Sequence, residues 1–545
     1  MSRADAFSGR WAAAGILLAA AALRIVHLRE IAAHDPFFDL HDVDSALYDA
    51  WARRILAGRA PDDGVLFLGP LYAYFLALVY AIVGATPAAV KAVQCALGVA
   101  SVALVGLLAR DCFDRRAALV AAAIAAGYEM LIFYGGTLLV ANVEVPLVLL
   151  LVWMSLRAMR DPTPLRWLVC GLLCGLCSLA RQTDLLYAPL LLAGLFALQR
   201  RALAAPRLAG LAAVFAGGVA VLLLPFAIHN YRASGDFVLV NNTGGANLYM
   251  GNNPYTDGTW VPPPIGRRVD NPIAMREAFA RTAEARTGHP MRPSEVSAFW
   301  AREALAFIAA EPGRWLVLEL RKLALFFNAR EVWNIRAIAV EREFSAVLRL
   351  PLLRYGLVAP LGWLGVALSA RRWRTLFPLH ALLAVYLASA LVFFVLARYR
   401  VGCVPVLIAF AGFAVVWLWD AARARRWRAL ALAGTALGAL IALADLPTGE
   451  DSLHMAWYNL GNKYLELARW QDAIASYEKS IAIRPRFISS RNNLALAYER
   501  AGRRDDAIRT WSEVLAWSAS HGELERAERA RRHLAGLGAA LPEAD

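Results

Sequence analysis

Charged residues are scarce in this chain of 545 residues. Asp, Glu, Lys and Arg make up only 18% of the sequence, whereas a soluble domain usually holds about a quarter. Hydrophobic residues make up 59%, and the mean hydropathy is +0.47. This composition excludes an ordinary soluble protein and indicates an integral membrane protein.

Cysteines are also few, and none of the six lies in the long polar loops. Cys170, Cys174 and Cys177 follow one another at the i, i+4, i+7 spacing of one helix face. We interpret them as small residues that ease helix packing in lipid rather than as a metal or redox site.

Nucleotide-binding fingerprints are absent, because neither G-x-x-x-x-G-K-[ST] nor a strand-borne G-x-G-x-x-G occurs. The net charge of +14 does not indicate nucleic acid as a partner, since the arginines mark the ends of apolar runs instead of forming one patch. Their positions are typical of membrane topology signals.

Apolar runs predict about eleven membrane spans. The short loops between them alternate between Arg-rich and Arg-poor, and we place the Arg-rich loops in the cytoplasm with the N-terminus. This alternation requires that the run 65–84 lies at the outer surface without crossing. The first run lacks a small-x-small cleavage site, so we interpret it as an uncleaved span. The predicted spans are 11–29, 88–109, 117–135, 143–159, 165–180, 184–199, 208–228, 352–370, 376–396, 402–419 and 429–445.

The span count predicts two large external loops, at about 30–87 and 229–351. It also places the C-terminal segment outside. We therefore expect an all-α membrane domain over residues 1–446 and a second domain over 447–545.

The C-terminal segment carries a tetratricopeptide pattern. Its residues Trp457, Leu460, Gly461 and Tyr464 match W-x2-L-G-x2-Y, and a related pattern recurs about 34 residues later. We predict two helical repeats and a capping helix at about 522–537. Such a domain either docks a protein or peptide or serves as a structural appendage.

The first external loop contains the stretch HDVDSALYDAWARRILAG, in which several carboxylates follow the first span. Asp44, Tyr48 and Trp51 recur at helical spacing, which predicts a short helix with its apolar side on the membrane. A carboxylate there binds a cation, accepts a proton or is simply solvated. Glu144, at the outer end of a span, is a second candidate because ionisable residues at such positions are often functional.

Arg398 and Arg400 lie in ARYRVG, on an external edge that otherwise avoids positive charge. A phosphate would explain them, because guanidinium groups bind phosphate in a bidentate manner. Arg232 and Lys322 extend the same argument. The Asn- and Gly-rich stretch 241–260 offers the donors and acceptors that sugar hydroxyls require, although a turn-rich loop has the same composition.

Together these features suit a lipid phosphate that carries a sugar. The cations would hold the phosphate, a carboxylate would deprotonate the incoming nucleophile, and the spans would hold the lipid tail. A donor activated in this way needs no nucleotide outside the cytoplasm.

The order of motifs resembles the GT-C glycosyltransferases that use polyprenyl-phosphate sugars, in particular bacterial relatives of protein O-mannosyltransferases and of aminoarabinose transferases. The resemblance rests on Asp44 with Tyr48 four residues later, GPLYAYFLAL from Gly69, HNYRASGDFVLV with GGANLYMGNNP, and ARYRVGCVPVL. It extends over 11–420 and does not include the repeat domain. Ser45 stands where many relatives have Glu, and the Lys that some relatives have before GPLY is missing.

The resemblance implies an inverting transferase of the bacterial inner membrane, with a cytoplasmic N-terminus and a periplasmic repeat domain. It implies that Asp44 is the catalytic base and that Glu144 assists. The donor phosphate would be bound by Arg398, Arg400, Arg232 and Lys322. The implied substrate contacts are Asp42, Tyr48, Asn247, Tyr249, Asn252, Asn253 and Tyr399.

The expected partners are a polyprenyl-phosphate sugar, membrane lipid and a protein bound by the repeats. Members of this fold class differ in metal dependence, so a divalent metal ion and no cofactor both stay open. Two other functions are considered: a lipid-sugar flippase and a membrane-anchored repeat scaffold. A flippase often has inverted repeats, which we do not find, and an anchor needs only one or two spans.

Overall fold

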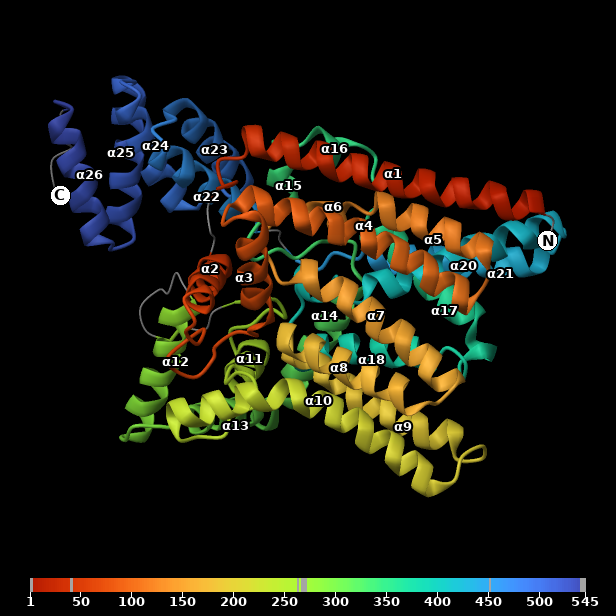
Figure 1. Cartoon of the computed structure of the whole chain (residues 1–545). Coiled ribbons are helices and arrows are strands. Elements are labelled where there is room, and N and C mark those ends of the chain that lie inside the picture. The colour runs from red at the N-terminus through yellow and green to blue at the C-terminus, as the bar shows by residue number, and fades with distance from the viewer. Residues whose placement is uncertain (1–2, 40–42, 262–263, 266–271, 450–451, 540–545) are drawn as a thin grey trace. The chain divides into compact units, whose positions relative to one another are not determined.

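The computed structural model describes residues 3–39, 43–261, 264–265, 272–449 and 452–539. The regular elements in these ranges are helices, which confirms the all-α prediction (Figure 1). The chain divides into two compact units. The first comprises Met1–Ala33, Asp39–Ile335 and Ser345–Thr448, and the second comprises His34–Phe38, Arg336–Phe344 and Gly449–Asp545.

Within the described residues of the first unit, six helices are long and apolar enough to cross a membrane. This set supports a multi-pass membrane protein. Four shorter apolar helices accompany them: α3 (Leu71–Val83), α8 (Pro164–Ala180), α17 (Tyr355–Leu368) and α18 (Phe377–Val392). The six long helices are α1 (Arg3–His34), α4 (Pro87–Cys112), α7 (Ala141–Arg160), α10 (Ala205–Ser234), α20 (Val404–Arg423) and α21 (Trp427–Ala444).

Two of the predicted spans are interrupted. The run 117–135 forms α5 (Arg115–Gly127) and α6 (Glu129–Gly135), because the Tyr128 backbone is extended and pairs with Leu353. The run 184–199 forms a 3-10 turn, η1 (Gln182–Leu186), followed by α9 (Tyr187–Gln199). Hydropathy did not reveal these breaks because the residues on both sides are apolar.

Helices α8 and α10 pack closely, and they lie side by side in Figure 1. A Cβ atom on Gly171 would lie 2.2 Å from the carbonyl oxygen of Phe215, so only glycine permits this approach. Cys170, Cys174 and Cys177 on the same helix are buried free thiols, as expected of small packing residues.

Shorter helices connect the spans. Helix α2 (Val43–Leu56) packs its apolar side on α3, and the rings of Tyr48 and Tyr72 meet edge to face at 5.1 Å. Helix α3 has 13 residues and covers about 20 Å, which is less than a bilayer core of about 30 Å. The remaining connecting helices of the first unit are α11 (Gly244–Gly251), α12 (Pro272–Thr287), α13 (Pro293–Ala310), α14 (Pro312–Phe327), α16 (Ala346–Arg349) and α19 (Ala397–Arg400), whereas α15 (Ile338–Glu341) belongs to the second unit.

The second unit contains two helix pairs followed by a further helix. Gly461 packs under the ring of Tyr477, whose hydroxyl donates to Asn462 at 2.7 Å. The unit also includes two short segments that lie inside the predicted membrane domain, and Arg336 joins them through an ion pair with Asp35 at 2.6 Å. The helices are α22 (Leu453–Glu466), α23 (Trp470–Ile483), α24 (Ile488–Arg500), α25 (Arg504–Ser520) and α26 (Leu524–Gly536).

Candidate active site

The first unit contains a cavity of about 550 Å³. Its walls come from the start of α2, the turn before α3, the turn η1, the start of α11 and the segment that follows α18. Leucine and phenylalanine side chains form much of the lining, and a few polar groups lie among them. A mixed lining of this kind is typical of a ligand site.

Asp44 and Arg398 meet in this cavity. Nη1 of Arg398 donates to Oδ2 of Asp44 at 2.5 Å, and the two side chains are 17% and 16% exposed. The first turn of α2 presents Asp44, whereas Arg398 is presented by α19. A backbone hydrogen bond of 2.8 Å from Ala397 to Val332 anchors α19. Two motifs that are distant in the sequence therefore place opposite charges in one cavity.

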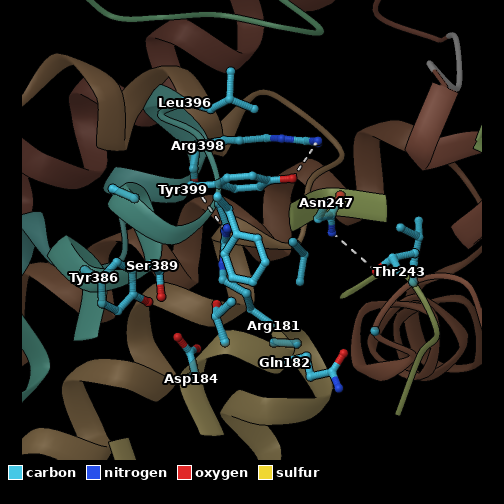
Figure 2. A pocket seen from close by; sticks show the side chains of 18 of the residues that line it. Arg181, Gln182, Asp184, Thr243, Asn247, Tyr386, Ser389, Leu396, Arg398 and Tyr399 are labelled. Atoms are coloured by element: carbon cyan, nitrogen blue, oxygen red, sulfur yellow. Dashed lines mark hydrogen bonds between the residues drawn. The ribbon is translucent and has the colours of Figure 1, made fainter. Parts of the chain in front are cut away.

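The ring of Tyr399 lies between two guanidinium groups, as Figure 2 shows. The centre of the ring is 4.4 Å from Cζ of Arg181 and 5.1 Å from Cζ of Arg398. Arg181 also donates to the Arg398 carbonyl at 3.0 Å. Burial lowers the pKa of Arg398, but Tyr399 and Asp44 outweigh this effect, so the pKa is raised and the charge is retained. The cavity thus holds two cations close together.

Glu144 is the partner of Arg181. Its two carboxylate oxygens accept hydrogen bonds of 2.7 Å from Nε and Nη2 of Arg181, and the Tyr386 hydroxyl donates to it at 2.9 Å. Glu144 is fully buried and does not line the cavity. In this arrangement it fixes the orientation of Arg181, and its predicted catalytic role stays a prediction.

Gly69 allows the turn before α3 to approach the end of α8 closely in the cavity wall. A Cβ atom there would lie 2.4 Å from the Leu179 carbonyl oxygen and 2.7 Å from that of Ala180. Because glycine has no Cβ, the turn before α3 can rest on the end of α8, directly before Arg181.

The other three predicted phosphate-binding cations are placed differently. Lys322 is fully buried and uses its ammonium group on Asn252, Glu319 and the Leu391 carbonyl at 3.1, 2.7 and 2.7 Å. Arg232 is exposed on α10 and does not line the cavity.

Arg400 borders the cavity, but its guanidinium group is bonded elsewhere. The group stacks on Tyr355 at 3.6 Å and forms an ion pair with Glu331 at 2.9 Å. It also donates to the carbonyl oxygens of Leu325, Phe326, Asn328 and Arg330. Arg400 therefore holds the chain that follows α14.

Only some of the predicted substrate contacts lie at the cavity. Tyr48, Asn247 and Tyr399 line the cavity, and burial raises the pKa of Tyr48. Tyr249 packs on Trp300 with ring centres 4.7 Å apart. Asn252 and Asn253 are buried and bonded to nearby carbonyls. Asp42 lies outside the described residues.

Sequence reasoning missed several residues of the cavity, among them Arg181, Asp184 and Ser389. Arg181 is an arginine in an Arg-poor loop, the same signal that drew attention to Arg398. Asp184 gave no comparable signal, because it is a single acid at the edge of an apolar run.

A metal ion was left open by the sequence. Among the described residues, no group of three or more His, Cys, Asp or Glu side chains could hold a metal ion.

Comparisons with known proteins support the fold. Residues 68–229 match the sequence profile described as dolichyl-phosphate-mannose-protein mannosyltransferase, and residues 454–487 match the tetratricopeptide repeat. These matches support a GT-C fold with a tetratricopeptide domain, as predicted from the sequence.

Several solved structures resemble the chain. The archaeal oligosaccharyltransferase AglB of Archaeoglobus fulgidus, in complex with an inhibitory peptide and a dolichol-phosphate, is 16% identical with a TM-score of 0.47. That match covers 86% of this chain and 60% of AglB. ArnT of Cupriavidus metallidurans, bound to undecaprenyl phosphate, is 15% identical with a TM-score of 0.34, covering 75% of this chain and 79% of ArnT.

One curated protein resembles the repeat region. The TPR repeat-containing protein MJ1428 of Methanocaldococcus jannaschii is 34% identical over 59 residues. The match covers 11% of this chain and 10% of that protein.

Proposed function

We propose that this protein transfers a sugar from a polyprenyl-phosphate carrier to an acceptor, with inversion at the sugar carbon. The family match supports lipid-phosphate-linked sugar transfer in general. The observation that carries the proposal is the meeting of Asp44, Arg398 and Arg181 in one largely apolar cavity.

In this proposal the donor phosphate binds between the two cations. Arg181 commits Nε and Nη2 to Glu144, which leaves Nη1 to face the phosphate. The phosphate competes with Asp44 for Nη1 of Arg398. The apolar lining, which includes Leu139, Leu185 and Phe393, accommodates the first isoprene units of the carrier.

Asp44 then acts as the general base. It removes the proton from the acceptor nucleophile, which attacks the anomeric carbon on the face opposite the phosphate. The bond between that carbon and the phosphate oxygen breaks, and its electron pair leaves with the phosphate. Arg398 and Arg181 stabilise the developing negative charge.

The proposal also assigns a side of the membrane. Helices α8 and α18 begin beside Arg-rich segments and end at the cavity. By the positive-inside rule we assign the cavity to the periplasmic face of a bacterial inner membrane, with the N-terminus in the cytoplasm and the repeat domain outside. The repeats would present a protein acceptor or partner.

The test is the variant Asp44→Asn in purified protein. Undecaprenyl-phosphate sugars and a periplasmic membrane fraction serve as substrates, and released undecaprenyl phosphate is measured. We expect turnover to fall by about 10²–10⁴-fold, the usual contribution of a general base. Asp63→Asn is the control, because Asp63 is exposed and does not line the cavity. Turnover like that of the wild type in Asp44→Asn contradicts the proposal.

A further inference from the structure

Two polar groups in the wall of the cavity have no hydrogen-bond partner among the described residues. They are the carboxylate of Asp184, with both oxygens buried, and the hydroxyl of Ser389. Asp184 is only 2% exposed. The turn η1 carries Asp184 and α18 carries Ser389, so two separate elements bring these groups to one cavity (Figure 2).

The neighbouring side chains cannot satisfy Asp184. Arg181 is the nearby cation, but Glu144 binds it through two hydrogen bonds. The Tyr386 hydroxyl lies close enough to Asp184 to interact with it, but its single proton is donated to Glu144 at 2.9 Å. Burial and the charge of Glu144 raise the pKa of Asp184 well above its ordinary value, which favours the protonated acid. A protonated carboxyl group can both donate and accept.

Leaving such groups unpaired is costly. A buried polar atom without a partner destabilises a fold by about 1–3 kcal/mol, and most native proteins avoid it. Where an unpaired group lines a cavity, a ligand that completes its hydrogen bonds accounts for its presence.

The chemistry of the cavity narrows the choice of ligand. The phosphate is already assigned to Arg398 and Arg181, and an isoprenoid chain has no hydrogen-bonding group to offer. A free cation is disfavoured because Arg181 and Arg398 line the same cavity. A sugar hydroxyl both donates and accepts a hydrogen bond, and therefore fits a carboxyl group beside a hydroxyl.

We propose that Asp184 and Ser389 form a subsite that binds hydroxyl groups of the transferred sugar. This subsite rests on the proposed function, because it needs a sugar attached to a carrier whose phosphate lies at Arg398. It assigns recognition of the sugar to the turn η1 and α18. The reacting groups stay at Asp44 and the two arginines.

The experiment separates binding of the sugar from binding of the carrier. Purified full-length protein is titrated with undecaprenyl phosphate and with undecaprenyl phosphate carrying glucose, mannose, galactose or arabinose. We expect the wild type to bind at least one sugar-bearing carrier about tenfold more tightly than the bare carrier. Asp184→Asn and Ser389→Ala should each reduce this advantage about two- to tenfold, the value of one hydrogen bond, and leave the affinity for undecaprenyl phosphate unchanged.

Ser178→Ala is the matched control, since its buried hydroxyl donates to the Cys174 carbonyl within α8 and does not line the cavity. The subsite is refuted if both cavity variants keep the full advantage of the sugar, or if the wild type binds all probes equally. Failure of the proposed function has another signature, namely that the wild type does not bind undecaprenyl phosphate at all. Should Asp184→Asn fail to fold, Ser389→Ala decides the question.

Discussion

Arg398 and Arg400 lie two residues apart on α19, yet the regions around them differ completely. Around Arg398 the hydrogen bonding is sparse: Asp44 is its ion-pair partner, and its buried Nε has no partner among the described residues. Around Arg400, four carbonyl oxygens and Glu331 accept its hydrogens. We infer that incomplete hydrogen bonding marks the residue that awaits a ligand, and complete hydrogen bonding marks the residue that holds the fold.

The largest expected effect is on stability, in the variant Arg400→Ala. It removes a buried cation, leaves Glu331 unpaired and frees several carbonyl groups, at a cost of about 3–5 kcal/mol. The measurement is thermal unfolding in detergent, where the midpoint should fall by several degrees. An unchanged midpoint would remove the distinction between the two arginines.

Arg398→Ala should reduce turnover much more than it reduces stability. Arg398 and Asp44 are both partly exposed, so water can reach the carboxylate once the arginine is removed. The variant should therefore fold, with a melting midpoint above that of Arg400→Ala. Its turnover on an undecaprenyl-phosphate sugar should fall by about 100-fold, as expected when one group that stabilises transition-state charge is lost. A folded Arg398→Ala protein with normal turnover would mean that the phosphate lies elsewhere.

A smaller effect is expected for Arg181→Lys. Lysine keeps the charge opposite Glu144 but cannot supply a planar fork to the carboxylate and a further donor to the phosphate. The KM for the donor should rise about tenfold, with a smaller change in kcat. Arg166→Lys provides the control, because Arg166 forms a surface pair with Asp161. Equal KM values for the two variants would contradict the role of Arg181.

The smallest effect concerns Asp184→Asn and depends on pH. Glu144, Arg181 and Tyr386 face this acid, and its pKa is raised in the folded protein. The unfolded value is about 3.9, so folding at higher pH requires either uptake of a proton or burial of a charge. The wild type therefore loses stability as the pH rises from about 4 towards the folded pKa, whereas asparagine does not titrate.

Thermal unfolding between pH 4 and pH 8 measures this difference. Asp184→Asn should be the more stable protein at pH 7 by about 1 kcal/mol or more, since a pKa difference of one is worth about 1.4 kcal/mol. Its advantage should shrink towards pH 4. A difference that does not vary with pH would show that the carboxyl group stays ionised in the fold.

Much of the fold follows from composition and periodicity. Hydropathy predicted the membrane helices and the 34-residue spacing predicted the repeats, because both patterns are local. Hydropathy did not predict the break at Tyr128, because this break depends on pairing with Leu353, which is distant in the sequence. The sequence also did not predict that the segments around Asp35 and Arg336 belong to the second unit, because this too depends on contacts between distant residues.

The site residues were harder to predict from the sequence than the fold. The positive-inside rule singles out Arg398 as an exception, and applied consistently it singles out Arg181 too. It cannot show that Lys322 and Arg400 use their hydrogens on carbonyl groups, because those carbonyls lie about 70 residues away in the chain. Asp184 is hidden because one acid barely changes the mean hydropathy of a long apolar run.

The contact at Gly69 has a consequence for substitutions that look harmless. The turn before α3 rests on the last carbonyls of α8, so a single methyl group at position 69 would push the end of that helix and displace the adjoining Arg181. Alanine is the smallest replacement for glycine, yet here its methyl group would force the turn and the helix end apart. We therefore expect Gly69→Ala to reduce turnover, because every other amino acid places a carbon atom where Gly69 has hydrogen.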